Sequence, residues 1–407
     1  MINVKGDSMF TSPRFYAALV QECARFIGPK NVLIVGSPSD ELMEHVLPLL
    51  ESQDTLVVAE YPNREESLLP LRGKFGSERV NFSDKSVWQL DPNFKFQIII
   101  LAVSLNGLSA DVAKTTLETC RLLLVNGGIL TCFEDLLLTQ PQPCFEGYRQ
   151  DFSVYSETLA SNLPPVRVHH LRFTPHAPQD CKNVRAVEGR DSLDFGFFRI
   201  AKDFLKFVFP LGAFSWGLKR LGSHLWYLPL VLLSGVAAFL RDPERKIEAD
   251  PNLVLSACDG KVLDVAIVSD PNLGEGQWLR IATFLSIFNV HINRSPVAGK
   301  VIDQFDVVGG YACAQLPKAN HNYSTYTVLA TPQGKVVVAQ RVGLIARRIY
   351  NWVGKGELLA QGERYGLIRM GSRTDVYLPC DKYESLVKVG DNIQAGITPI
   401  AKLNNKL

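Results

Sequence analysis

Residues 366–379 read GLIRMGSRTDVYLP and contain a candidate nucleophile between two short apolar repeats. Apolar residues recur with a period of two on both sides of Gly371 and Ser372, which predicts two β-strands. The simplest interpretation is a hairpin whose turn contains Gly371 and Ser372. A serine hydroxyl is a weak nucleophile unless a neighbouring base activates it. Any chemistry at Ser372 therefore depends on side chains from elsewhere in the chain.

Two other stretches supply side chains that could assist a serine. LSACDGKV (255–262) contains Asp259 next to a glycine, and FNVHINRSPVAGKV (288–301) contains His291. Carboxylate and imidazole groups are the usual partners of an activated serine. Each also has a structural alternative, because Asp-Gly is a common turn pair and a lone histidine is usually a satisfied polar residue.

Four motifs in one order carry a family resemblance: RDPER (241–245), DGKV (259–262), FNVHINRSPVAGKV and GSRTDVYLP (371–379). In this order they resemble the phosphatidylserine decarboxylases, over about residues 195–405. The chain looks most like the short prokaryotic branch, whose cleavage motif is Gly-Ser within a GSR run. The resemblance implies a pyruvoyl-dependent carboxy-lyase that converts phosphatidylserine to phosphatidylethanolamine and CO₂.

The same resemblance implies that the chain cuts itself between Gly371 and Ser372. Attack by the Ser372 hydroxyl on the Gly371 carbonyl gives an ester, and β-elimination then leaves dehydroalanine, which hydrolyses to a pyruvoyl group at position 372. That carbonyl forms a Schiff base with the substrate amine and accepts electrons as the carboxylate leaves. The cleaved chains, 1–371 and 372–407, would stay together as a heterodimer, with a homo-oligomer as a further expectation. The chemistry needs no metal and no diffusible cofactor.

The resemblance implies roles for some residues of these motifs more directly than for others. Asp259 matches the family aspartate, and His291 matches the first histidine of the HxxH stretch found in longer bacterial enzymes. The second histidine of that stretch falls on Arg294. Either His291 serves alone as base and proton donor, or another group shares the work. His321 lies where Asn322-Tyr323-Ser324 replaces the usual Asn-Glu-Arg.

Arginines near these motifs are candidate substrate-binding residues. Guanidinium groups bind phosphate and carboxylate through paired N–H donors. A cluster of arginines also often forms a solvated surface with structural ion pairs. The candidates are Arg294, Arg347, Arg348 and Arg373.

Residues 1 to about 175 alternate apolar strands with helical patterns. The strands are NVLIVG (31–36), TLVVAE (55–60) and FQIIILAV (96–103), and Ser39 or Asp40 could cap the helix after the first. This alternation predicts a Rossmann-like, doubly wound α/β domain with a parallel sheet.

This region resembles the class I S-adenosylmethionine methyltransferases over roughly 140 residues. Only Gly36 remains of their glycine-rich loop, whereas Glu60 matches the acidic residue that holds the ribose. The resemblance implies S-adenosylmethionine as a second cofactor and a bifunctional protein that methylates an ethanolamine lipid. The alternatives are a degenerate scaffold and a docking or oligomerisation module.

Residues 176–203 lose the periodic pattern and predict a linker. The runs 204–218 and 225–240 are apolar but shorter than the roughly 20 residues that a spanning helix needs. Three alternatives remain: a buried helix pair, a short transmembrane hairpin, and a hairpin in one leaflet with Trp216, Trp226 and Tyr227 at the interface. The last would give a membrane-associated protein on the cytoplasmic face.

From 247 onward, short strands separated by turns predict a β-rich α+β domain. The decarboxylase domain that the resemblance implies spans residues 241–407. The predicted strands are 261–268, 300–308, 324–331 and 335–342, and residues 345–353 fit a strand or a short helix.

The composition limits the function further. The chain has 407 residues, which suggests two or three domains, and its net charge of +2 gives no case for nucleic acid. Eight scattered cysteines fit a reducing cytosol, and the N-terminus has no signal-peptide pattern. Decarboxylation of a soluble amino acid is the alternative within the same chemistry, and the apolar hairpin counts against it.

Overall fold

The computed structural model describes residues 12–61, 68–136, 154–160, 162–174, 184–186, 192–195, 198–344, 348–369 and 372–404. The chain divides into two compact units, Met1–Gly196 and Phe197–Leu407. Each unit has its own hydrophobic core, so each is described by itself.

The first unit is built on one sheet whose strands follow the order β3-β2-β1-β4-β5-β7-β6-β8. Strands β1 to β5 pair in parallel, whereas β7 runs antiparallel to both of its neighbours. The predicted Rossmann-like α/β fold is confirmed, with an antiparallel strand added. The strands are β1 (Asn31–Val35), β2 (Thr55–Ala59), β3 (Val80–Phe82), β4 (Phe96–Ser104), β5 (Leu124–Asp135), β6 (Val154–Leu159), β7 (Val166–Arg172) and β8 (Ser192–Asp194).

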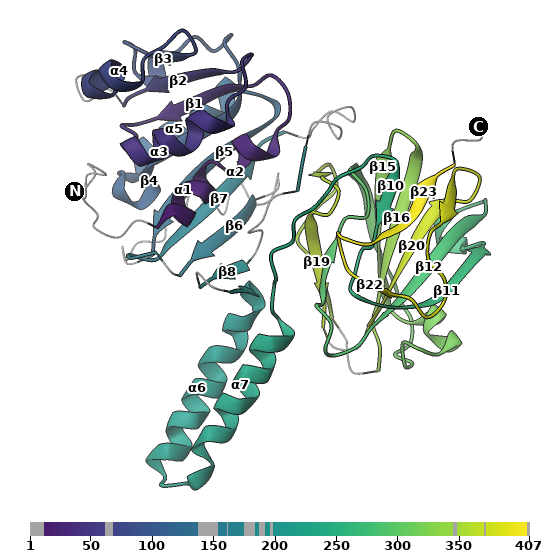
Figure 1. Ribbon diagram of the computed structural model, residues 1–407. Coiled ribbons are helices and arrows are strands. Elements are labelled where there is room, and N and C mark those ends of the chain that lie inside the picture. The colour runs from purple at the N-terminus through teal and green to yellow at the C-terminus, as the bar shows by residue number, and fades with distance from the viewer. Residues whose placement is uncertain are drawn as a thin grey trace. The chain divides into compact units, whose positions relative to one another are not determined.

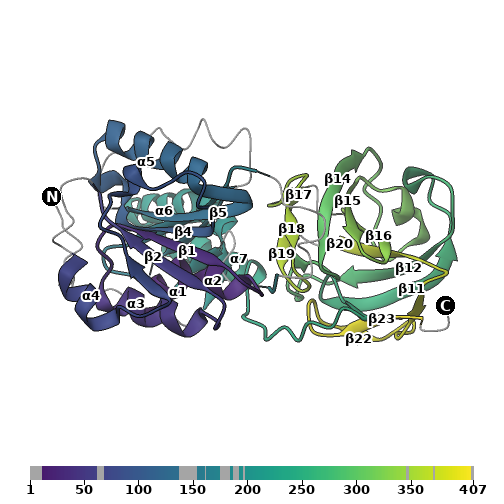
Figure 2. The same ribbon diagram turned by 90° about the horizontal axis from the view of Figure 1, so that it is seen from above.

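Helices cover both faces of this sheet (Figure 2). Because side chains alternate along a strand, Val32 and Ile34 pack on one face and Leu33 and Val35 on the other. Helix α5 covers the second face and the remaining helices cover the first. The helices are α1 (Pro13–Leu19), α2 (Gln21–Arg25), α3 (Asp40–Val46), α4 (Leu69–Phe75) and α5 (Ala110–Leu123). Ser39 caps α3 by accepting the Leu42 N–H at 3.2 Å, which confirms one of the two predicted caps.

The second unit begins with β9 (Arg199–Ala201) and a pair of helices, α6 (Leu205–Arg220) and α7 (Leu228–Phe239), which lie side by side in Figure 1. The short helix η8 (His224–Tyr227) joins them. The predicted linker therefore contains β8 and β9. In the described ranges, no helix has the length and apolar character needed to cross a membrane.

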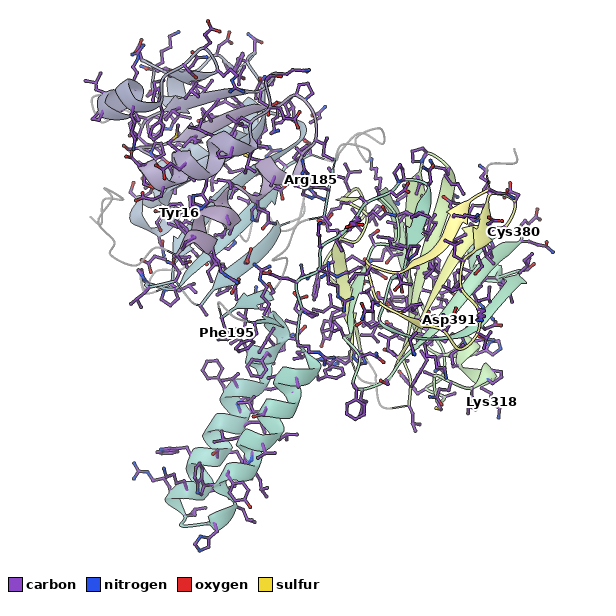
Figure 3. The ribbon with its side chains drawn as sticks, in the orientation of Figure 1. Tyr16, Arg185, Phe195, Lys318, Cys380 and Asp391 are labelled. Atoms are coloured by element: carbon purple, nitrogen blue, oxygen red, sulfur yellow. The ribbon has the colours of Figure 1, made fainter. Side chains whose placement is uncertain are left out.

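Apolar side chains of the helix pair are largely exposed, and Figure 3 shows side chains projecting outward around it. Only Ser215 in α6 and Pro229 in α7 are buried. This exposure counts against one of the three alternatives, the buried core helix pair. The exposed large side chains are Leu205, Phe209, Phe214, Trp216, Leu221, Leu225, Trp226, Tyr227, Leu228, Leu230, Val231 and Leu232.

The rest of the second unit is a β domain with a central sheet in the order β18-β14-β15-β16-β20-β12-β11-β22. The four strands predicted between 261 and 342 are confirmed as β11, β14, β15 and β16. The central strands are β11 (Gly260–Val268), β12 (Trp278–Leu285), β14 (Gly299–Val307), β15 (Ser324–Thr331), β16 (Gly334–Arg341), β18 (Leu358–Leu359), β20 (Ser372–Pro379) and β22 (Asn392–Ile393).

Two three-stranded sheets, β10-β23-β21 and β13-β19-β17, complete the domain. The segment predicted as a strand or short helix contains β17. The strands are β10 (Leu253–Leu255), β13 (Ile292–Arg294), β17 (Ile349–Asn351), β19 (Arg364–Ile368), β21 (Tyr383–Ser385) and β23 (Pro399–Leu403).

The two strands around Gly371 and Ser372 do not form a hairpin with each other. Strand β19 pairs with β13 and β17, whereas β20 pairs with β12 and β16 in the central sheet. The prediction of two strands is confirmed, but the prediction of a hairpin is wrong. The hairpin prediction assumed that strands adjacent in the sequence pair with each other, whereas β19 and β20 each pair with strands from elsewhere in the chain.

Candidate active site

Ser372 is the first residue of β20, a strand paired on both sides within the central sheet. It lies opposite Leu285, the last residue of β12. Its side chain is completely buried, and its Oγ has no hydrogen-bond partner within the described residues. A buried hydroxyl without a partner is costly and therefore needs an explanation. Gly371 lies outside the described residues.

His291 is held by a tight turn that follows β12. Asn289 accepts hydrogen bonds at Oδ1 from the Ser286 N–H, at 2.9 Å, and from the Ser286 hydroxyl. The carbonyl oxygen of Asn289 then lies 2.9 Å from His291 Nδ1. On the far side, the Ile368 N–H donates to the His291 carbonyl at 3.3 Å. His291 is thus fixed between the end of β12 and the end of β19, the strand that leads toward Ser372.

The hydrogen bond of His291 determines its tautomer. A carbonyl oxygen can only accept, so Nδ1 carries the proton and Nε2 presents a free lone pair when the ring is neutral. Burial, with a smaller contribution from the Arg241 charge, lowers the pKa of His291 to about 4. The ring is therefore neutral at physiological pH. Its Nε2 is buried and has no hydrogen-bond partner in the part of the chain that the structure describes.

A buried polar cluster lies on the Ser372 face of β20 and was not predicted from the sequence. Thr374, two residues after Ser372, accepts at Oγ1 from Asn293 Nδ2 at 3.2 Å. Gln340 Nε2 donates to Asn293 Oδ1 at 2.7 Å. All three side chains are essentially inaccessible. The one feature of the sequence that pointed to this cluster was the position of Asn293, two residues after His291 in the same motif.

Asp259 is anchored by a bidentate ion pair. Its two oxygens accept from Arg245 at 2.6 and 2.8 Å, and the Ala395 N–H donates to Oδ1 at 2.8 Å. The adjoining Gly260 passes so close to β12 that an added Cβ would lie 2.0 Å from the Phe284 carbonyl oxygen. Glycine is therefore required there. The Asp259 charge acts on His291 in the direction that raises its pKa.

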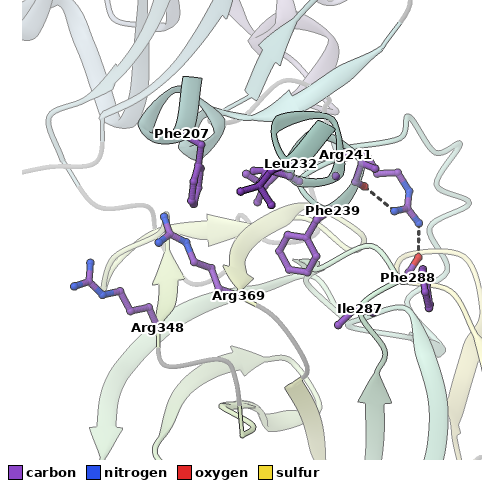
Figure 4. A pocket seen from close by; sticks show the side chains of 12 residues that line it. Phe207, Leu232, Phe239, Arg241, Ile287, Phe288, Arg348 and Arg369 are labelled. Carbon is purple, nitrogen blue, oxygen red and sulfur yellow. Dashed lines mark hydrogen bonds between the residues drawn. The ribbon is translucent and has the colours of Figure 1, made fainter. Parts of the chain in front are cut away.

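The RDPER motif connects the end of α7 to these groups. Arg241 donates to the carbonyls of Ala238 at 2.7 Å and Phe288 at 2.6 Å (Figure 4). Asp242 accepts from Arg364, a fully buried residue of β19, at 2.7 Å. Together with the Arg245 pair, these contacts attach the helix pair to the strands that carry the candidate catalytic residues.

The four predicted arginines have different environments. Arg294 is buried and donates to the carbonyls of Gly362 and Pro243 at 3.0 and 3.4 Å. Arg373 makes a two-point ion pair with the buried Asp375. Arg347 lies outside the described residues, whereas Arg348 is exposed and lines a cavity. Among these four, Arg348 is the one seen at a cavity.

Asp375 joins Arg373 to a second arginine. Arg341 Nε donates to Asp375 Oδ2 at 2.8 Å, and its Nη2 donates to the hydroxyls of Tyr326 and Tyr377 at 2.8 Å. Burial alone would raise the pKa of the Asp375 carboxyl, but Arg373 and Arg341 hold it below its usual range. This network fixes the face of β20 opposite to Ser372.

A cavity of about 760 Å³ lies between the base of the helix pair and the β domain (Figure 4). Apolar side chains from α6, α7 and the turn after β12 form most of its lining. Phe239, the last residue of α7, contacts both the cavity and the ring of His291, with ring centroids 4.2 Å apart. Arg348 and Arg369 form its basic end. His321 lies elsewhere, exposed at the end of the short helix Pro317–His321.

Comparison with known proteins agrees with this geometry. A family model described as phosphatidylserine decarboxylase matches residues 232–401. A phosphatidylserine decarboxylase proenzyme from Symbiobacterium thermophilum is 45% identical over 184 residues, covering 44% of this chain and 85% of that protein. The chain belongs to the phosphatidylserine decarboxylase family. The resemblance inferred from the four motifs is confirmed, and with it a lyase made as a proenzyme.

A phosphatidylserine decarboxylase proenzyme implies a pyruvoyl group, and the residues around position 372 fit one. Among the described residues, Ser372 Oγ is a buried polar atom without a partner at the start of a strand, and the Nε2 of His291 is a second such atom. A serine that is converted to a pyruvoyl group loses its hydroxyl, so a hydroxyl without a hydrogen bond is compatible with that role.

The first unit has a more distant likeness to methyltransferases. The N-methyltransferase NodS from Bradyrhizobium japonicum matches at a TM-score of 0.31 and 13% identity, covering 40% of this chain and 94% of that one. The 1,6-didemethyltoxoflavin-N1-methyltransferase from Burkholderia thailandensis matches at a TM-score of 0.30 and 20% identity, covering 39% of this chain and 76% of that one. Likenesses this remote carry no argument about what the unit binds.

Gly36 and Glu60 lie at the ends of the adjacent parallel strands β1 and β2. Gly36 has a φ of +104°, and the ring of Tyr61 would be 3.6 Å from a Cβ placed there. Glu60 is buried and accepts at Oε1 from the Tyr61 N–H at 3.0 Å. The two residues thus end adjacent strands, with Tyr61 packed beside Gly36. Their role in binding S-adenosylmethionine stays a prediction.

Proposed function

We propose that this chain decarboxylates phosphatidylserine to phosphatidylethanolamine and CO₂ at a membrane surface. In this proposal the pyruvoyl group is formed from Ser372 when the chain cuts itself after Gly371. The observation that carries it is the completely buried, unpartnered hydroxyl of Ser372 at the start of a central strand. The membership of the family supports the reaction, and the site residues give it a mechanism.

His291 acts as the base that removes the Ser372 proton. The support is its tautomer, because Nδ1–H is engaged by the Asn289 carbonyl and Nε2 has a free lone pair. The lowered pKa keeps this lone pair available over the physiological range. Once Nε2 has taken a proton, the same ring can return one to carbon after CO₂ has left. His291 can therefore perform both roles without a second histidine at position 294.

Asp259 acts as a positioning residue in this proposal. Its oxygens are occupied by Arg245 and the Ala395 N–H, so it is not a free base. Its negative charge favours the protonated form of His291 after proton transfer. Asn293 and Thr374 support the site by fixing the Ser372 face of β20.

When present, the pyruvoyl carbonyl supplies an electron sink for the carboxylate's bonding electrons. The chain supplies a binding site for a lipid-sized molecule. The cavity is largely apolar, and Phe239 lines it and packs against the His291 ring. An apolar environment destabilises the charged carboxylate of the substrate more than the uncharged CO₂ that forms from it. This difference favours decarboxylation. Arg348 is the predicted arginine that lies at this cavity.

The helix pair α6–α7 is proposed to lie in one leaflet of the membrane. Its apolar side chains are exposed around both helices, a surface that lipid would cover. At its tip, Lys219 lies 5.1 Å from the Trp226 ring and Arg220 lies 5.0 Å from the Trp216 ring. Basic and tryptophan side chains together are typical of the headgroup region. The cavity at the base of this pair would then open to a lipid substrate.

Electrophoresis under denaturing conditions tests the proposal. The wild-type chain should give a large fragment (1–371) and a small one (372–407), whereas Ser372→Ala should give one intact band. Ser385→Ala is a matched control, because its hydroxyl lies in the same small fragment but donates to the Val387 carbonyl. A single full-length band in the wild type would contradict the proposal. Activity on free amino acids but not on phosphatidylserine in liposomes would instead favour the soluble-substrate alternative.

A further inference from the structure

Arg369 occupies an unusual position at the basic end of the cavity. It follows β19 and precedes Ser372 by three residues, so it belongs to the segment that must be cut. Its guanidinium lies 5.4 Å from the Phe207 ring centroid and 4.8 Å from that of Tyr350. Phe207 comes from α6, and Tyr350 comes from β17. Two aromatic faces thus hold the cation in place while leaving N–H groups available.

The charge of Arg369 is only weakly neutralised. Its Nη2 lies 3.4 Å from Asp203 Oδ1, and Asp203 is shared with Lys206. Arg369 Nε is buried and has no hydrogen-bond partner within the described residues. Arg348 lines the same end, and its backbone carbonyl accepts a hydrogen bond from the backbone N–H of Arg369 at 3.2 Å. Arg369 and Lys206 therefore share one carboxylate, that of Asp203.

The opposite end of the cavity is mostly apolar. Phe239, Ile287 and Phe288 line it, and Phe239 packs against His291 (Figure 4). Arg241 also lines this end, where its guanidinium donates to the Ala238 and Phe288 carbonyls. A ligand that fits both ends must combine an anionic group with apolar surface. This combination describes an anionic phospholipid better than a free amino acid.

We propose that Arg369, assisted by Arg348, binds the phosphodiester of the lipid substrate. This inference rests on the proposed function and assigns one group of the substrate to one end of its site. The phosphodiester is chosen over the carboxylate for a chemical reason. A guanidinium paired with the carboxylate would stabilise the ground state and lose its partner as CO₂ forms, which slows the reaction. A phosphodiester keeps its charge throughout, so binding it gives affinity without that penalty.

Direct binding to an uncut chain tests this assignment without relying on activity. Ser372→Ala provides the background, and calorimetry measures its affinity for monomeric dihexanoyl phosphatidylserine and dihexanoyl phosphatidylethanolamine. Adding Arg369→Gln should weaken both lipids by about 10- to 100-fold, the usual value of a charged hydrogen bond. Arg369→Lys should lie between, because it keeps the charge but not the planar fork. Lys335→Gln, at the far end of β16, is the matched control and should change neither affinity.

The outcomes separate the possible failures. Weakened binding of phosphatidylserine alone would mean that Arg369 contacts the carboxylate, which overturns the assignment. Unchanged binding of both lipids in a folded Arg369→Gln or Arg369→Lys chain would also overturn it. The proposed function fails separately, when a chain with Ser372 intact shows no cleavage. Thermal unfolding of each variant establishes that it is folded before binding is compared.

Discussion

The ring of Phe239 lies against the ring of His291, with centroids 4.2 Å apart and planes inclined by 40°. Phe239 ends the helix pair that exposes its apolar surface, and His291 is the proposed base of the reaction. One contact therefore connects the proposed membrane-binding element to the proposed base. It also explains why His291 is so well desolvated, since an aromatic face takes the place of water.

Self-cleavage should have an unusually acidic pH limit. Burial lowers the pKa of His291 from 6.5 to about 4, so the base stays neutral well below pH 6. Cleavage of a pulse-labelled chain should keep a constant rate down to about pH 5 and then fall. His291→Gln should abolish cleavage, and His291→Gly should regain part of it with added imidazole. A rate that falls with a midpoint near 6.5 would contradict a buried His291 base.

The same pKa shift affects stability with a defined sign. Between about pH 4 and 6.5 the unfolded chain binds a proton at this ring that the folded chain does not. Stability present above pH 6.5 should therefore be lost as the pH falls toward 4, by on the order of 3 kcal/mol. Comparing the urea midpoints of the wild type and His291→Gln at both pH values measures it, because the variant lacks this contribution.

Phe239→Ala should move the pH limit of cleavage toward neutrality. Removing the ring lets water reach His291, and its pKa should rise from about 4 toward the ordinary value of 6.5. Phe288→Ala serves as a control, since Phe288 lines the cavity and is largely exposed but has no ring contact with His291 among the contacts described. Equal pH profiles for Phe239→Ala and wild type would show that the contact does not set the pKa.

Asp375→Asn should strongly destabilise the β domain. The change leaves Arg373 and Arg341 buried without their shared charge partner. Losing one member of a buried ion pair costs about 3–5 kcal/mol in the free energy of unfolding. Asp381→Asn, at an exposed position two residues after β20, should change it by less than about 0.5 kcal/mol. A destabilisation below 1 kcal/mol for Asp375→Asn would mean that the network does not hold β20.

Replacing two apolar residues of α6 should weaken membrane binding. Phe209 is 76% exposed and Trp216 is 63% exposed. Each such side chain contributes roughly 1.5–3 kcal/mol when it leaves water, so Phe209→Ser with Trp216→Ser should reduce liposome binding at least tenfold. Val308→Ser, 90% exposed but outside the helix pair, is the control. Equal sedimentation of the double variant and the control with liposomes would exclude the helix pair as the membrane-binding element.

Local sequence patterns predicted the features that depend on residues close together in the sequence. The strand spans, the Ser39 cap and the motifs around Ser372 and His291 were all visible as short patterns. The pairing of β19 and β20 was not, because each strand pairs with partners distant in the sequence. Arg369 was missed for the same reason, since its aromatic partners come from α6 and β17. Arg373 was proposed for substrate, although Asp375, two residues away, pairs with it.

The mass of the small fragment tests the central claim most directly. If Ser372 becomes a pyruvoyl group, the fragment 372–407 from purified protein should be lighter than its sequence mass by one ammonia molecule, and it should resist Edman degradation. Treatment with sodium cyanoborohydride and ammonium should remove the block. A fragment with the full sequence mass and a free N-terminal serine would mean ordinary hydrolysis, and would contradict the account.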